Sequence, residues 1–467
     1  MLAPGQFERR VGATGTMALL AVFVFFAVLA YWQVWRTDLS DEANNPRVLA
    51  SFQDPRRGRI LDRDGNELAV SLPGGERRYT DASVAHLVGY IDARYGSQGA
   101  ELVFNSRLSG EAAASWGAAI DAEFLRAGRR GLDVRLTIDP AIQRAAASAL
   151  GSRKGAVVAL DPRNGEVLAM ASVPTYDPGA LSEDGEALLK DPDSPLVNRA
   201  TQGLYPPGST FKAVTATSLL ENKVVAPDTM VTCKDQVVID GFPVQCDNVR
   251  QGPGTYPFKN AFTFSVNAIF AEQGVKLGWD RLLATATRFG FGSRLPFTLP
   301  TAATQVHSPE AKLTKTLLAS TAFGQGEILA TPLQMAAVAS AIANGGVLAS
   351  PHLGLSALDD NRVVERLGPD AEARVMTAEV ARTLRDFMVS VIDNGQAAGV
   401  AIQGVSVGGK TGTAEVSSGG ASHAWFIAFA PAEDPVIAVA VVVEQGGRGG
   451  EVASPIAGQV IRAALAR

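Results

Sequence analysis

The chain has 467 residues, of which 46% are hydrophobic and 19% charged, an ordinary composition for a globular protein of two or three domains. A formal net charge of −5 and the lack of a basic stripe argue against a nucleic-acid partner. Two cysteines and four scattered histidines offer too few ligands for a metal site, so we expect neither a metal nor another cofactor.

The first element in chain order is an apolar segment over residues 11–35, which contains no charged residue. As a helix it would be roughly 37 Å long, enough to cross a bilayer. Arg9 and Arg10 precede it and acidic residues follow it, which predicts a cytoplasmic N-terminus (residues 1–10) and an extracytoplasmic remainder. A cleaved signal peptide is the alternative, but the apolar run exceeds the roughly 7–15 residues of such peptides and no Ala-x-Ala site follows. The sequence favours an uncleaved, single-pass anchor in the plasma membrane.

Residues 36–135 are polar, with short apolar runs and turn signals. The runs 59–62 and 67–70 flank Asp64-Gly65, a pattern that predicts a β-hairpin. Nothing in this segment suggests catalysis. We interpret it as a small, β-rich domain.

Residues 136–467 have the pattern of an α+β domain. Asp139 is suited to cap a helix that starts at Pro140. Apolar runs at 156–160 and 167–171 surround a strong turn, and three more strands are legible near the C-terminus, at 405–414, 423–430 and 436–444. Because long helical runs separate the two groups, we expect one central five-stranded antiparallel sheet, assembled from both ends of the domain and flanked by helices.

The stretch around Ser209 has the pattern of a nucleophilic serine at the start of a helix. Pro206, Pro207 and Gly208 prevent a helix before Ser209, whereas the residues after it favour one. Lys212 follows three positions later, so on a helix its amine lies beside the serine hydroxyl. A serine needs an adjacent base to attack, and a lysine with a lowered pKa can be that base. The alternative is an N-cap serine with an unrelated surface lysine, because Ser-x-x-Lys alone is common.

Two later stretches supply partners for this pair. Ser265-Val266-Asn267 has the form Ser-x-Asn, and Lys410-Thr411-Gly412 lies in a glycine-led strand. Ser-x-x-Lys, Ser-x-Asn and Lys-Thr-Gly, in this order, are the signature of penicillin-binding proteins and serine β-lactamases. Three such stretches in order are far more specific than one.

The chain resembles the high-molecular-weight class B penicillin-binding proteins, and the likeness covers most of its length. Besides the stretches above, it rests on Asn198-Arg199-Ala200, Phe323-Gly324-Gln325-Gly326, and the segments 57–65 and 136–139. The resemblance implies a transpeptidase domain over residues 136–467, standing on a pedestal over residues 36–135. The pedestal is too short for the glycosyltransferase domain of class A relatives, and its compactness is similar to the penicillin-binding protein A subgroup.

The resemblance also implies roles for these residues. Ser209 would attack the carbonyl between two D-alanines of a peptidoglycan stem peptide, with Lys212 as the general base. Ser265 and Lys410 would complete a proton path to the leaving group, and the charge of Lys410 would help to keep Lys212 neutral. Asn267 would hydrogen-bond the substrate. The amine of a second stem peptide would then resolve the acyl-enzyme into a cross-link.

Further binding roles fall on the strand that contains Lys410. By resemblance, Thr411 and Thr413 would hold the terminal carboxylate of the substrate, and the N–H groups of Ser209 and Thr413 would form the oxyanion hole. Gly412 would let a substrate backbone approach the strand, and a simple bulge is the alternative explanation for the glycines there.

The only two cysteines, Cys233 and Cys246, lie 13 positions apart in a turn-rich stretch. On the outer side of a membrane they are expected to form a disulfide, with two free buried thiols as the alternative.

The sequence therefore predicts a membrane-anchored D,D-transpeptidase of cell-wall synthesis that β-lactams acylate. A β-lactamase or D,D-carboxypeptidase would give the same acyl group to water, and the anchor, the pedestal and the lack of a recognisable deacylating carboxylate count against it. A scaffold without catalysis is the other alternative, which the complete set of site residues disfavours. The resemblance implies one protein partner, a polytopic glycosyltransferase of the shape, elongation and division type, and residues 11–70 are our hypothesis for the contact.

Overall fold

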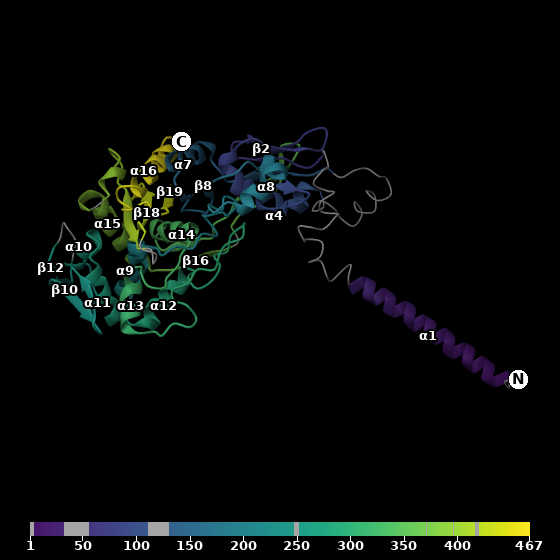
Figure 1. Ribbon diagram of the computed structural model, residues 1–467, viewed down its shortest axis with the longest axis horizontal. Coiled ribbons are helices and arrows are strands. Elements are labelled where there is room, and N and C mark those ends of the chain that lie inside the picture. The colour runs from purple at the N-terminus through teal and green to yellow at the C-terminus, as the bar shows by residue number, and fades with distance from the viewer. Residues whose placement is uncertain are drawn as a thin grey trace.

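The computed structural model describes residues 4–31, 56–110, 130–246, 252–369, 371–395, 397–415 and 420–467. Helix α1 (Pro4–Ala30) lies apart from the rest of the molecule in all three ribbon views (Figure 1). Its described side chains, over residues 15–28, are exposed, with Leu19 at 73% and Phe23 at 72%. In the part of the chain that the structure describes, no helix meets the length and hydropathy needed to cross a bilayer. The expected anchor over residues 11–35 is thus not confirmed, and residues 32–35 fall outside the described part.

The predicted central sheet is confirmed. It consists of β7 (Gly155–Leu160), β8 (Val167–Val173), β17 (Gly408–Ala414), β18 (His423–Ala430) and β19 (Ile437–Val443). These five strands are antiparallel to their neighbours, in the order β17-β18-β19-β7-β8. Two strands come from the start of the domain and three from its end, as expected.

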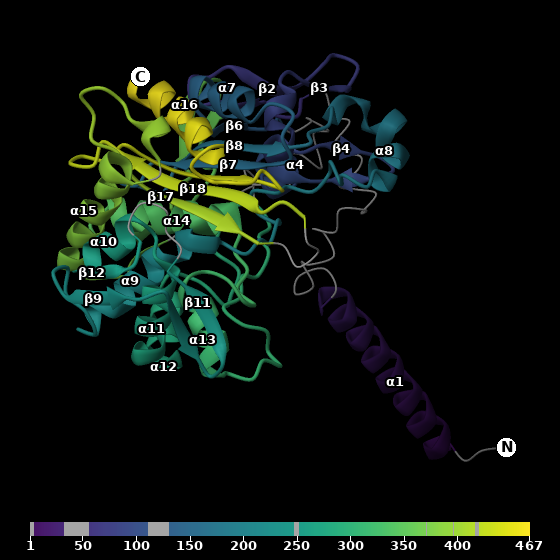
Figure 2. The same ribbon diagram turned by 60° about the vertical axis from the view of Figure 1, so that its left-hand side comes forward.

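Helices cover both faces of this sheet (Figure 2). Side chains alternate along each strand, so that on β18 Ile427 joins the hydrophobic cluster with α14 (Pro332–Ala343), whereas Phe426 joins the cluster with α7 (Pro140–Leu150) and α16 (Ala453–Leu465). All twelve residues of α14 are buried, because more helices pack behind it. The predicted cap of α7 is present, since the Asp139 carboxylate accepts hydrogen bonds from the N–H groups of the first turn.

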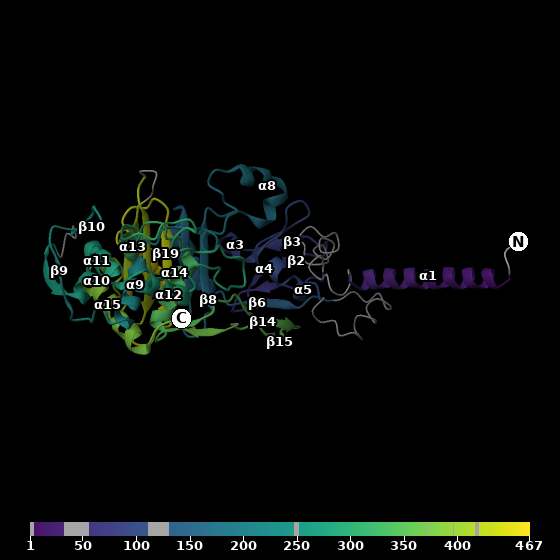
Figure 3. The same cartoon turned by 90° about the horizontal axis from the view of Figure 1, so that it is seen from below.

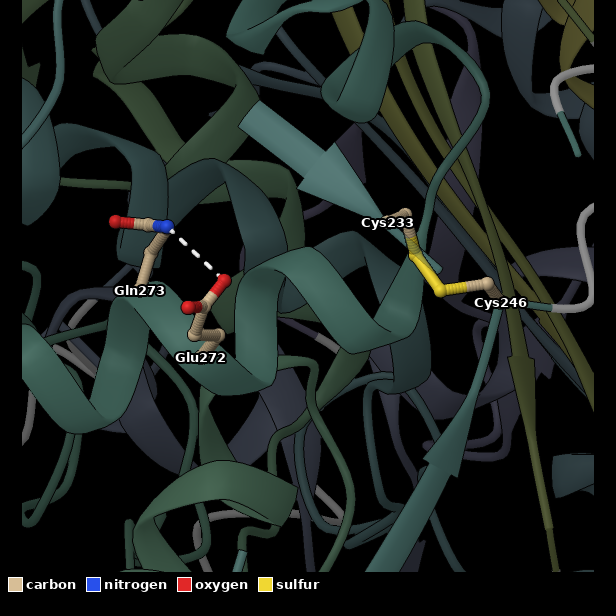
Figure 4. The surroundings of a disulfide bond; sticks show 4 residues. All are labelled: Cys233, Cys246, Glu272 and Gln273. Atoms are coloured by element: carbon tan, nitrogen blue, oxygen red, sulfur yellow. Dashed lines mark hydrogen bonds between the residues drawn. A yellow bond between two sulfur atoms is a disulfide. The ribbon is translucent and has the colours of Figure 1, made fainter. Parts of the chain in front are cut away.

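The helices beyond α14 form the half of the domain that contains Ser209. The disulfide joins Cys233, at the end of one short strand, to Cys246, directly after another, and Figure 4 shows it beside the helix that bears Glu272 and Gln273. The elements of this half are α9 (Lys212–Glu221), β9 (Met230–Cys233), β10 (Gln236–Ile239), β11 (Phe242–Gln245), β12 (Gly254–Pro257), α10 (Phe258–Thr263), α11 (Asn267–Leu277), α12 (Trp279–Arg288), α13 (Lys315–Ala322), β13 (Val347–Ala349), β16 (Glu372–Arg374) and α15 (Ala378–Asn394).

The pedestal is built on a six-stranded sheet. Its strands are β1 (Ile60–Leu61), β2 (Glu67–Ser71), β3 (Arg77–Tyr79), β6 (Asp133–Leu136), β14 (Gly354–Asp359) and β15 (Arg362–Arg366). Their order in the sheet is β15-β14-β6-β1-β2-β3, and the predicted hairpin is the β1–β2 pair. Two strands come from far downstream, because β14 pairs antiparallel with β6 and extends the sheet on that side.

Small elements complete the pedestal side, which lies between α1 and the five-stranded sheet in Figure 3. Among them, α8 (Leu181–Lys190) projects from the surface of the molecule in that view. The others are α3 (Ala85–Val88), β4 (Ile91–Asp92), β5 (Gly96–Ser97), α4 (Gly99–Val103) and α5 (Asn105–Leu108).

A buried ionic cluster ties the pedestal together. One carboxylate oxygen of Glu101 accepts hydrogen bonds from Arg57 at 3.0 and 2.7 Å, and the other accepts one from Arg77 at 2.7 Å. Asn105 accepts a further bond from Arg57 at 2.7 Å. Burial opposes the charge of Glu101, but the two guanidinium groups outweigh it and hold its pKa below the ordinary value. One carboxylate thus bridges the two buried guanidinium groups.

Candidate active site

Ser209 lies in a 3₁₀ turn, η6 (Gly208–Phe211), which leads directly into α9. The predicted helix N-terminus is therefore a 3₁₀ turn that precedes the α-helix, and the two prolines stand directly before it. Gly208 has φ +54°, and a Cβ there would lie 2.8 Å from the Thr413 carbonyl oxygen. Only glycine allows this turn to approach β17 so closely.

Lys212 is fully buried one turn after Ser209. Its Nζ lies 3.0 Å from Ser209 Oγ, 2.8 Å from the Ser265 carbonyl oxygen, 3.0 Å from Ser265 Oγ and 2.6 Å from Asn267 Oδ1. The Phe270 ring lies 5.3 Å from the same nitrogen. The amine is thus fixed beside the proposed nucleophile.

Ser265 stands in the link between α10 and α11, with the left-handed φ of +61°. This conformation is unfavourable for a residue with a side chain, and such strain tends to occur at functional sites. It allows both the carbonyl and the hydroxyl of Ser265 to reach Lys212. Asn267, the first residue of α11, also accepts a hydrogen bond from this amine through Oδ1.

Lys410 comes from β17 and is also fully buried. Its Nζ donates to Ser265 Oγ at 2.8 Å and to the Thr411 carbonyl at 3.1 Å. Burial lowers its pKa to about 7, because the low-dielectric surroundings disfavour the ammonium form. At neutral pH Lys410 therefore exchanges a proton easily, and its charge is present only part of the time.

These contacts form a continuous path from Ser209 through Lys212 and Ser265 to Lys410. An ammonium group has three N–H donors, whereas four acceptor atoms lie within 3.0 Å of Lys212 Nζ. In the neutral form that a general base requires, Lys212 would donate to the Ser265 carbonyl and to Asn267 Oδ1, which would leave its lone pair for the Ser209 hydroxyl proton. The arrangement can therefore activate a serine for attack.

β17 forms the edge of its sheet next to η6. A Cβ on Gly412 would meet the Pro207 carbonyl at 2.9 Å, so this glycine first serves the contact between strand and turn. Thr411 is buried and Thr413 exposed, and the strand period places both on the pleat opposite to Lys410. A Cβ on Gly208 would lie 3.2 Å from Thr413 N, which brings the two predicted oxyanion-hole residues together.

The structure thus joins Ser209, Lys212, Ser265, Asn267 and Lys410 in one series of contacts, and it places Gly412 and Thr413 of β17 beside the Ser209 turn. It also adds Glu444, which the sequence did not single out, and it places Gln325 beside β17. Gln325 donates from Nε2 to the Thr413 carbonyl at 3.4 Å, and Glu444 contacts the loop before Ser209. The Phe-Gly-Gln-Gly stretch was a signal for Gln325, whereas no local pattern marks Glu444. Among the described residues, no group of three or more His, Cys, Asp or Glu side chains is arranged to hold a metal ion.

Comparisons with protein families match two parts of the chain. The family described as "Penicillin binding protein transpeptidase domain" matches residues 155–462, which is more than half of the chain. The one described as "Penicillin binding protein A dimerisation domain" matches residues 57–134.

Individual relatives cover nearly the full length. The peptidoglycan D,D-transpeptidase PbpA of Mycolicibacterium smegmatis is 36% identical over 98% of both chains, and that of Mycobacterium tuberculosis is 34% identical over the same shares. A solved structure of penicillin-binding protein A from M. tuberculosis, an imipenem acyl-enzyme complex, has a TM-score of 0.81 at 34% identity and covers 89% of this chain and 100% of that one.

Proposed function

The chain belongs to the family of penicillin-binding protein transpeptidases, and from this premise we propose that it cross-links peptidoglycan stem peptides through an acyl-enzyme at Ser209. One observation carries the proposal. The buried amine of Lys212 lies 3.0 Å from Ser209 Oγ and connects through Ser265 to Lys410. A nucleophile, a base and a proton path therefore meet at one point.

Acylation starts with the attack of Ser209 Oγ on the carbonyl carbon between the two terminal D-alanines. The hydroxyl proton passes to the neutral amine of Lys212 as the Oγ–C bond forms. The carbonyl oxygen becomes an oxyanion, which the N–H groups of Ser209 and Thr413 stabilise. The tetrahedral intermediate then holds both the old amide nitrogen and the new ester oxygen.

The leaving group needs a proton before the old C–N bond breaks. Ser265 Oγ contacts both lysine amines, so it can give its proton to the nitrogen and regain one from Lys410 or Lys212. The terminal D-alanine departs as a neutral amine and leaves an ester on Ser209. The amine of a second stem peptide then attacks this ester, and the steps run in reverse to restore Ser209 and form the new peptide bond.

β-Lactams follow the first half of the same route. Attack of Ser209 opens the strained ring, and the ring nitrogen stays tethered to the acyl group, so no leaving group makes room for an acceptor amine. Relatives of this chain appear in solved structures as acyl-enzymes with penicillin G and imipenem, which supports penicillin as an inhibitor here.

The first test labels the full chain in detergent with a fluorescent penicillin. We expect stable label on the native chain and none on Ser209→Ala. The matched control is Ser218→Ala, which removes a buried hydroxyl of α9 that donates to the Arg281 carbonyl and should leave labelling normal. Label that is released within minutes would indicate a β-lactamase instead, and an unlabelled native chain would favour a scaffold.

A second test separates cross-linking from hydrolysis. The full chain is given a stem pentapeptide with and without an acceptor amine, and released D-alanine and dimeric peptide are measured. A transpeptidase yields dimer in proportion to the acceptor. D-alanine release without dimer would identify a carboxypeptidase.

The membrane location is a further part of the proposal. The exposed apolar side chains of α1, together with Arg9 and Arg10 before them, support a single-pass anchor with a cytoplasmic N-terminus and an extracytoplasmic catalytic domain. In intact cells, an external protease should then remove the catalytic domain, and full protection of that domain would overturn the location.

We also propose a polytopic glycosyltransferase as partner, contacted through residues 11–70. Co-purification of the two proteins tests it. Replacement of residues 11–35 by an unrelated anchor should weaken the complex, and an unchanged yield would contradict this contact.

A further inference from the structure

A polar cluster lies beside the loop that carries the nucleophile, outside the path described above. Tyr205 is buried, and its hydroxyl donates to Glu444 Oε1 at 2.7 Å. The same oxygen accepts a bond from Arg199 Nε at 2.8 Å. One carboxylate at the end of β19 therefore joins the Asn-Arg-Ala stretch to the loop before Ser209.

Further hydrogen bonds fix each of the three residues of this cluster. The backbone of Tyr205 exchanges hydrogen bonds with Ala330 at 3.0 and 2.9 Å. Arg199 donates further bonds to the carbonyls of Asp193 and Ser194, at 2.5 and 3.1 Å. The Glu444 N–H donates to the Lys154 carbonyl at 2.8 Å, so the backbone at Glu444 is fixed independently of its side chain.

The ring of Tyr205 connects this cluster to the strand of Lys410. It makes edge contacts with His423 and Trp425, at centroid distances of 5.4 and 6.1 Å. Trp425 stands opposite Gly412 in the register of β17 and β18. A Cβ on Gly412 would lie 2.9 Å from both Trp425 Cβ and the Pro207 carbonyl oxygen. The strand and the turn are therefore in close contact at this point.

We propose that Glu444 is a positioning residue for acylation, which acts through Tyr205 to fix the distance between the Ser209 turn and the Thr413 segment of β17. The inference rests on the proposed function. Among its described contacts, the Glu444 side chain touches neither Lys212 nor Lys410, so its effect passes through the loop geometry. The two N–H groups of the oxyanion hole belong to the two segments whose spacing it sets.

The protonation of the cluster fits this role. Burial first, and then the neighbouring Glu444, raise the pKa of Tyr205 well above its ordinary value, so the hydroxyl stays a donor at every physiological pH. His423 accepts a bond from the Gln445 N–H on Nδ1, and burial lowers its pKa, so its ring stays neutral near pH 7. The cluster therefore keeps one arrangement over the working range.

Misplaced oxyanion donors should slow bond formation more than they weaken initial binding, because the oxyanion exists only after attack. We expect Tyr205→Phe and Glu444→Met each to lower the limiting acylation rate constant of the full chain about tenfold, with the penicillin dissociation constant within about twofold. Combined, the two substitutions should cost little more than either alone, because they break one shared contact. Stopped-flow labelling over a range of penicillin concentrations separates the two constants.

Tyr176→Phe is the matched control. Tyr176 is similarly buried, and its hydroxyl donates to the Ala85 carbonyl at 3.3 Å, far in sequence from the nucleophile loop. It should lose stability but keep the native rate constant. A native rate constant in Tyr205→Phe, an equal loss in Tyr176→Phe, or a loss confined to the fraction of labelled protein would each overturn the inference. A native chain that takes up no label would instead overturn the proposed function.

Discussion

The pedestal and the catalytic centre each contain a buried cluster of charged side chains. The two clusters offset the desolvation cost of those charges in opposite ways. In the pedestal, Glu101 forms short, direct ion pairs with both Arg57 and Arg77. At the centre, Lys410 is equally buried, but among the described residues no carboxylate forms an ion pair with it. The side chains of the pedestal cluster therefore stay ionised, whereas the Lys410 ammonium group at the centre can lose its proton.

The choice of cation follows from this difference. Arginine keeps its charge in proteins and presents a planar fork that suits a carboxylate, so it serves the pedestal. Lysine loses its proton when it is buried without a partner, and a group that titrates near neutrality can act in catalysis. Burial of charge is thus structural in one cluster and functional in the other.

The largest effect should come from removal of the amine beside Ser209. Lys212→Met keeps a linear apolar chain of similar length but has no base, so acylation should fall by about a thousandfold or more. Penicillin labelling measures the rate, and a melting curve shows whether the variant is folded. Acylation within tenfold of the native rate would mean that another group takes the proton.

The pedestal should respond in stability and not in chemistry. Glu101→Gln leaves two buried guanidinium groups without their carboxylate and should lower the free energy of unfolding by about 3–5 kcal/mol. The acylation rate of the folded fraction should stay unchanged. Glu67→Gln, at a long, partly exposed pair with Arg59, is the control and should cost less than about 1 kcal/mol. Equal losses of stability in Glu101→Gln and Glu67→Gln would contradict a structural role for the buried pedestal cluster.

The lowered pKa of Lys410 should make the free energy of unfolding depend on pH. Its pKa is about 7 in the folded chain and about 10.4 when unfolded, so the unfolded chain binds more protons between these values. Stability should therefore rise with pH, by about 3 kcal/mol from pH 7 to pH 9.5. Denaturant titrations of the native chain and of Lys410→Met at both pH values isolate this contribution. The same pH slope in both proteins would refute it.

The smallest effect tests the periphery of the pedestal cluster. Asn105→Ala removes one acceptor from Arg57 but leaves Glu101 in place, so it should cost about 1.5 kcal/mol. Ser106→Ala, exposed on the same helix, should stay within about 0.5 kcal/mol. A loss of stability as large as that of Glu101→Gln would show that Asn105 contributes more than one additional hydrogen bond to Arg57.

The sequence predicted the parts of this molecule that local signals specify. The turn between β7 and β8 and the cap at Asp139 depend on residues within a few positions, and the five strands were legible from their apolar runs. The three catalytic stretches were recognisable because each keeps its own spacing. The disulfide between the only two cysteines was the favoured of two alternatives.

Other features depend on pairs that no local pattern connects. β14 joins the pedestal because β6 offers it an open edge, and that pairing spans more than 200 positions. Glu444 and Tyr205 lie 239 positions apart and meet only through the sheet. The pKa of Lys410 follows from burial by several elements, so the motif alone could place the residue but not its protonation.

The strand pair β14–β15 also affects which recombinants between related genes can form a complete pedestal sheet. Its pedestal sheet is encoded in two separated stretches of the gene, since β1, β2, β3 and β6 precede the catalytic motifs, whereas β14 and β15 lie between the second and the third motif. A single recombination event near residue 136 would therefore import a sheet that lacks two of its strands. A chimera joined there would pair β6 of one parent with β14 of the other, so the two strands must be compatible in register for the pedestal sheet to form.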